Sequence, residues 1–133
     1  MLALALLLGG AGAARAGWGI GLSAASSAQA SAASAPAAPT GVASACTSAL
    51  GTTVVVSWNP VANATSYTIW KSTSSATSGY AVAATGATGS AWTSGSLSTG
   101  TYWFEVSAVT GTNWNSANSS GTAQRTILVA ACT

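Results

Sequence analysis

Very few side chains in this 133-residue sequence are of a kind that performs catalysis or holds a ligand. The sequence has three Lys or Arg residues, one acidic residue and no His, so charged residues make up 3% of the chain. The acidic residue is Glu105, and the basic residues are Arg15, Lys71 and Arg125. The thiols are those of Cys46 and Cys132.

This small set excludes most catalytic and metal-binding chemistry. A Ser-His-Asp triad and a Cys-His pair both need His, and glycoside hydrolysis needs two carboxylates. Zinc sites that use His and calcium sites built from carboxylates are excluded for the same reason. Three basic residues are too few to neutralise a phosphate backbone. We therefore predict no enzymatic activity, no catalytic residues, no cofactor, no metal site and no nucleic-acid partner.

The composition limits the size of the folded part. The sequence contains 31 Ala, 21 Ser, 18 Thr and 15 Gly, together 85 of its 133 residues. The remaining large apolar residues suffice for the core of one small domain but not for a second.

The first 30 residues have the pattern of an export segment. An apolar run from Leu2 to Leu8 is followed by small residues, and small-x-small triplets end at Ala16 and Ala30. We expect a signal peptide over residues 1–30, cleaved after Ala16 or Ala30, an Ala/Ser/Pro linker over residues 31–38, and one domain over residues 39–133. Two alternatives stay open: a membrane anchor over residues 1–22, disfavoured by Arg15 and several glycines, and an intracellular start.

From Thr40 onward, β-branched and aromatic clusters alternate with turn-rich stretches, a pattern typical of an antiparallel sandwich. Residues 101–109 alternate most clearly, with Tyr102 and Phe104 on one face and Trp103 and Glu105 on the other. We predict strands at residues 41–46, 52–58, 66–72, 80–84, 90–93, 101–109 and 121–129. The predicted fold class is all-β, a seven-strand antiparallel immunoglobulin-like β-sandwich.

Four segments, in this order, resemble the sequence pattern of a fibronectin type III domain. Pro39 stands near the start, VVVSWNPV (54–61) ends a strand at Trp58, and ATSYTIWKS (64–72) opens the next with Tyr67. LSTGTYWFEVSAV (97–109) contains a Leu-turn-Tyr corner that is one residue shorter than the usual one and lacks its frequent Pro. The resemblance covers residues 39–129 and implies a fibronectin type III-like fold. No Arg-Gly-Asp follows Val109, so integrin-type adhesion is not implied.

The alternation also predicts which side chains fill the space between the two sheets. The expected core residues are Trp58, Tyr67, Ile69, Tyr102, Phe104 and Val106. Trp92 matches an aromatic core position of the family that the sequence resembles.

The two cysteines are expected to form a disulfide. An exported chain favours disulfide formation, and the first and seventh strands of such a sandwich end at the same pole. A bond between Cys46 and Cys132 would span 86 residues of sequence, which the chain-entropy account values at about 4–5 kcal/mol. Free thiols or an intermolecular bond are the alternatives.

Three tryptophans are candidate contact residues. Trp70 and Trp103 are expected side by side on the outer face of neighbouring strands, either exposed to a ligand or covered by the linker or a second copy. Trp114 lies in the predicted loop over residues 110–120, which should share a pole with the loop over residues 59–65. It is either a loop anchor or a contact residue. Lys71 and Glu105 lie on adjacent strands and could form an ion pair.

These observations favour a secreted, non-catalytic fibronectin type III-like module that mediates extracellular protein or surface contacts. A subunit of a secreted assembly is the first alternative, because a nearly uncharged surface does not repel a second copy. A carbohydrate-associated accessory domain is the second. The expected partner is an extracellular protein or a polysaccharide, self-association is allowed, and a membrane is involved only if the N-terminal segment is not removed.

Overall fold

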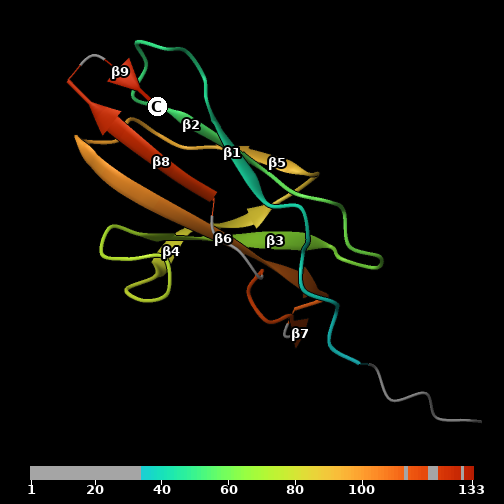
Figure 1. Ribbon diagram of the computed structural model, residues 1–133. Helices are drawn as coiled ribbons and strands as arrows, with labels where there is room; N and C mark the ends of the chain where they lie inside the picture. Colours follow the sequence, from blue (N-terminus) through green and yellow to red (C-terminus); the bar gives the residue numbers. More distant parts are fainter. Residues whose placement is uncertain (1–33, 113, 120–122, 130) are drawn as a thin grey trace, which may run out of the picture. The chain divides into compact units, whose positions relative to one another are not determined.

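Short alternating segments of β-branched and aromatic residues give the domain its strands. The computed structural model describes residues 34–112, 114–119, 123–129 and 131–133 (Figure 1). In these residues there are nine strands and no helix. The strands are β1 (Ala43–Cys46), β2 (Val54–Ser57), β3 (Ser66–Ser72), β4 (Ala81–Ala87), β5 (Ala91–Thr93), β6 (Gly100–Thr110), β7 (Trp114–Asn115), β8 (Ala123–Leu128) and β9 (Ala131–Cys132).

The strands form two antiparallel sheets that face each other. The smaller sheet has the order β1-β2-β5, and the larger has the order β4-β3-β6-β8-β9, with β7 paired to the far end of β6 (Figure 1). The predicted all-β sandwich is confirmed, and each predicted strand has a counterpart, with the same ends for residues 66–72 and shifted ends for the others. All seven predicted strands are present, and the structure adds β7 and β9. These strands have two residues each, too few to show an alternating pattern.

The core lies between the two sheets and holds every residue that the alternation assigned to it. Phe104, Ile69 and Val106 have no exposed surface. The rings of Trp58 and Tyr67 lie 5.0 Å apart between centroids, and Trp92 packs 6.5 Å from Phe104. The complete cluster is Val54, Val56, Trp58, Tyr67, Ile69, Tyr102, Phe104, Val106, Ala108, Ile127 and Cys132.

The edge of β6 is covered by three successive segments. β8 pairs with it from Gly100 to Phe104, and β7 pairs with its last two residues. Between them, the N–H groups of Val106 and Ala108 donate to the hydroxyls of Ser119 and Ser116 at 3.1 and 2.8 Å. The loop after β6 is therefore held along the strand by side-chain oxygens.

One edge strand of the larger sheet is β4, which is irregular. Its register against β3 shifts between Tyr67 and Ile69 and again between Ile69 and Trp70. Gly86 lies in this stretch with a φ of 70°, a conformation that favours glycine. β-Bulges bend a strand and hinder pairing with another chain. Because β4 contains no charged residue and no Pro, the bulges are the feature that protects its edge.

The predicted signal peptide over residues 1–30 lies outside the described residues, as does the beginning of the predicted linker. Residues 34–133 form one compact unit. Within this part of the chain, no helix is long and apolar enough to cross a membrane.

Candidate functional site

Trp70 and Trp103 share the outer face of the larger sheet but do not form an exposed pair. In the strand register, Trp70 lies opposite Glu105, and Trp103 lies opposite Ser72. Both tryptophans are half-buried. The indole N–H of Trp70 donates to the hydroxyl of Ser107 at 3.0 Å. The two tryptophans thus share one face of neighbouring strands, as expected, and their contact with a ligand, the linker or a second copy stays a prediction.

Lys71 and Glu105 do not pair, because the β3 register places them on opposite faces. Lys71 lies opposite Phe104 on the core-facing side, and its Nζ stands 5.5 Å from the centroid of the Tyr102 ring. Glu105 faces outward and accepts a hydrogen bond of 2.8 Å from the side-chain amide of Asn118. The suggested ion pair is therefore replaced by a cation–π contact and an amide–carboxylate bond.

The loops before β3 and after β6 meet at one pole, as the strand count predicted. Thr65 donates from its backbone N–H and its hydroxyl to the carbonyl of Val109, at 2.7 and 3.1 Å. The hydroxyl of Thr110 donates to the carbonyl of Asn63 at 3.1 Å. Trp114 lies beside these loops in β7 and has 49% of its surface exposed. At this pole, a partly exposed aromatic side chain therefore lies beside two loops that are joined by hydrogen bonds.

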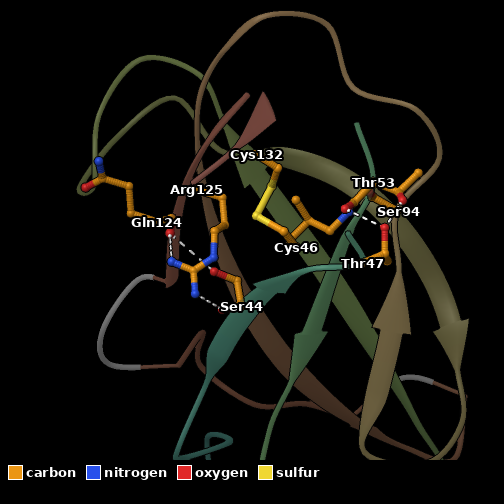
Figure 2. The surroundings of a disulfide bond; sticks show 9 residues. Ser44, Cys46, Thr47, Thr53, Ser94, Gln124, Arg125 and Cys132 are labelled. Atoms are coloured by element: carbon orange, nitrogen blue, oxygen red, sulfur yellow. Dashed lines mark hydrogen bonds between the residues drawn. A yellow bond between two sulfur atoms is a disulfide. The ribbon is translucent and has the colours of Figure 1, made fainter. Parts of the chain in front are cut away.

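The opposite pole is closed by the disulfide. Cys46 at the end of β1 is bonded to Cys132 in β9, with 5.8 Å between the Cα atoms (Figure 2). The predicted bond is confirmed, and the described residues contain no free cysteine. The backbone N–H of Cys132 donates to the carbonyl of Ala49 at 3.0 Å, which fixes the loop after β1 against β9.

An apolar cluster surrounds this disulfide pole. Leu50, in the loop fixed through Ala49, is 77% exposed. Leu128 and Val129, at the turn between β8 and β9, are 50% and 88% exposed. The sequence analysis missed these residues, because isolated aliphatic residues in loops carry no pattern. Their loops are linked by the hydrogen bond from Cys132 to Ala49.

Arg125 was also missed, although its position in the alternation could have revealed it. It lies on β8 between Ala123 and Ile127, both buried, so its side chain points between the sheets. Its guanidinium donates through Nη2 to the carbonyl of Ser44 on β1 and through Nη1 to the carbonyl of Gln124 at 3.0 Å. The hydroxyl of Ser44 donates to the same Gln124 carbonyl at 3.3 Å (Figure 2).

The surface that results is almost uncharged. The charged side chains of the described residues are Lys71, Glu105 and Arg125, and all three are half-buried with partners inside the domain. Among these residues there is no group of three or more metal-ligating side chains. The arrangement is suited to contact with a partner through apolar and amide groups.

The two facing antiparallel sheets define an immunoglobulin-like β-sandwich. Consistent with this class, the hydroxyl of Tyr102 donates to the carbonyl of Ser98 at 2.9 Å, forming the tyrosine corner that such sandwiches use before their sixth strand.

No protein-family model matches the sequence, and no curated protein sequence matches it. Several solved structures do match this chain. The domain is similar to an Fn3-like protein from Clostridium thermocellum, with a TM-score of 0.60 and 33% identity over 68% of this chain and 92% of that one. It is similar to an FN3tt mutant, with a TM-score of 0.57 and 23% identity over 70% and 97% of the two chains. It is also similar to the fibronectin type III domain of human fibronectin type III domain containing protein 3, with a TM-score of 0.52 and 24% identity over 73% and 90%. The chain belongs to the fibronectin type III family.

Proposed function

We propose that this protein is a secreted, non-catalytic fibronectin type III module that mediates extracellular protein or surface contacts. The observation that carries the proposal is the contrast on its surface. The charged side chains in the described part of the chain are all half-buried, whereas Leu50, Trp114 and Val129 expose about half or more of their surface. A contiguous exposed apolar patch marks a contact surface, and these side chains are the large apolar groups available for one.

Secretion is supported by the disulfide together with the sequence of the first 30 residues. Disulfides persist in oxidising compartments and are rare in the cytosol. The apolar run and the small-x-small triplets supply the export signal.

The contact function is tested on the cells that produce the protein. The labelled domain is incubated with their surface or extracellular material, and binding is compared for the wild type, Trp114→Ala and Leu128→Ser. We expect at least one variant to lose most of the binding while keeping its unfolding midpoint within a few degrees. Ser96→Ala, at an exposed position, is the control. Equal binding by all four proteins contradicts the contact proposal.

Secretion has its own measurement, the intact mass of the protein recovered outside the cells. The mass locates the cleavage site and shows whether two hydrogens are missing, as a disulfide requires. Recovery of the protein only inside the cells, with both thiols free, contradicts this part of the proposal.

A second candidate function, a subunit of an extracellular assembly, is favoured by the low charge. The sequence carries a formal net charge of +2, too little to hold copies apart. Size-exclusion chromatography over a range of concentrations separates the two functions. A protein that stays monomeric at high concentration contradicts the assembly function and is consistent with the contact-module function.

A carbohydrate-associated domain is the third function that the fold allows. It would use Trp70 and Trp103, but the bond between Trp70 and Ser107 leaves less of that indole open for stacking on a sugar. Binding to insoluble polysaccharides that is lost in Trp70→Ala and in Trp103→Ala would support it.

A further inference from the structure

The disulfide pole contains a second, non-covalent link between the sheets. Two hydrogen bonds cross the gap between β1 and β8. Arg125 donates to the carbonyl of Ser44, and the hydroxyl of Ser44 donates to the carbonyl of Gln124 (Figure 2). We refer to Ser44, Gln124 and Arg125 as the Arg125 clasp.

The clasp is aligned with the disulfide on both strands. On β1, Ser44 precedes Cys46 by two residues and therefore lies on the same face of the strand. On β8, Arg125 precedes Ile127 by two residues, and Ile127 is the partner of Cys132 in the hairpin formed with β9. Cys46 therefore lies two residues after the clasp residue Ser44, and Cys132 lies opposite a residue two positions after the clasp residue Arg125.

We propose that Arg125 is a positioning residue for disulfide formation, which takes place in a domain that has already folded. The clasp can form before the sulfur–sulfur bond, because it uses one side-chain cation, one hydroxyl and two backbone carbonyls. The core between the sheets consists mainly of side chains other than the cysteines, so we expect it to form without the bond. In the reduced domain the clasp therefore holds β1 near β8, and the two thiols face each other at a high effective concentration.

The chemical step requires an oxidant, for which we take a small disulfide such as oxidised glutathione. The thiolate of one cysteine attacks a sulfur of the oxidant, forms a mixed disulfide and releases one glutathione thiolate. The second cysteine thiolate then attacks the protein sulfur of this mixed disulfide and releases the second glutathione. The protein loses two electrons and two protons, and the oxidised glutathione becomes two molecules of reduced glutathione. Only the second, intramolecular attack depends on the clasp.

The test measures the equilibrium between the dithiol and the disulfide in mixtures of reduced and oxidised glutathione. Thiols are trapped by alkylation, and the oxidised fraction is read from the mass. Arg125→Met should lower the effective concentration about tenfold, as expected for loss of a hydrogen bond from a charged donor. Arg125→Lys should fall between that variant and the wild type, because a single ammonium reproduces only part of the guanidinium geometry.

Two further variants complete the design. Ser44→Ala removes one cross-sheet bond and leaves both carbonyls, so it should lower the effective concentration by a few-fold. Lys71→Met removes the other cation of the described domain, which contacts Tyr102 instead, and should leave the value within about twofold.

An unchanged effective concentration in Arg125→Met overturns the proposal. Arg125 would then stabilise the oxidised and reduced domains equally, as a purely structural residue does. Tryptophan fluorescence of the reduced proteins supplies the second readout. An unfolded reduced wild type also overturns the proposal, because the clasp would not exist before oxidation. If reduced Arg125→Met unfolds and the reduced wild type does not, the Ser44→Ala variant provides the test. A few-fold lower effective concentration of the thiols in Ser44→Ala supports the proposal, and an unchanged value overturns it.

Discussion

Ser119 and Val106 form a reciprocal pair in which a serine takes the place of a strand residue. The N–H of Val106 donates to the Ser119 hydroxyl at 3.1 Å, and the N–H of Ser119 donates to the Val106 carbonyl at 2.8 Å. Ser116 repeats the arrangement with Ala108, and Ser94 repeats it with Val54. In each case a side-chain oxygen replaces a backbone carbonyl where the neighbouring strand is absent.

Ser119→Ala should lower the free energy of unfolding by about 1–3 kcal/mol, because it leaves the buried N–H of Val106 without an acceptor. Urea denaturation measures the loss, and amide hydrogen exchange should be faster at Val106. Ser96→Ala, which changes an exposed serine, should have no measurable effect on either quantity. A Ser119→Ala variant as stable as the wild type would show that water takes over the missing acceptor.

Trp58 should tolerate replacement by Phe far better than replacement by Ala. Its side chain is 4% exposed, and its Nε1 is buried with no hydrogen-bond partner. Trp58→Ala should cost about 3–5 kcal/mol. Trp58→Phe keeps a ring against Tyr67 and removes the unsatisfied donor, a gain of about 1–3 kcal/mol that offsets much of the lost packing. Chemical denaturation of both variants tests this, and similar losses for Phe and Ala would contradict it.

Tyr102→Phe isolates the tyrosine corner. The variant keeps the ring that Lys71 contacts and loses only the hydrogen bond to Ser98, so we expect a loss of about 1 kcal/mol in the free energy of unfolding. Tyr102→Leu, which loses the ring as well, should cost more. Thermal and urea unfolding give both values. If the two variants lose the same amount, the ring rather than the corner bond stabilises this turn.

Removal of the disulfide should lower the free energy of unfolding by about 2–5 kcal/mol, since the bond spans 86 residues. The double variant Cys46→Ala/Cys132→Ala, compared with the wild type in urea, gives this number. Far-UV circular dichroism should still show a β-sheet spectrum without denaturant. A loss below about 1 kcal/mol would mean that the denatured chain is not restrained by the bond.

The sequence was sufficient for the parts of the fold that depend on alternation. Tyr102, Phe104 and Val106 alternate with outward residues over a long strand, so the core face of β6 could be predicted. The common pole of Cys46 and Cys132 followed from strand direction alone. These features need only a periodic pattern and a count of strands.

The errors concern residues whose environment depends on register and on partners distant in sequence. Lys71 and Glu105 are on adjacent strands, but only the register of β3 against β6 shows that they face opposite sides. The ring of Trp70 could not be placed without its bond to Ser107.

Ser116 and Ser119 were taken as part of a loop, because a hydroxyl that replaces a strand carbonyl has no sequence signature. Arg125 was overlooked for the opposite reason: a cation is expected to face solvent, and this one points between the sheets.

The link between Cys46 and Cys132 makes the intervening polypeptide a closed ring. A protease that cuts one peptide bond anywhere in that ring opens it without releasing a fragment. The two pieces stay attached, and the sheets can keep their pairing. Two cuts are needed to remove any portion of the ring.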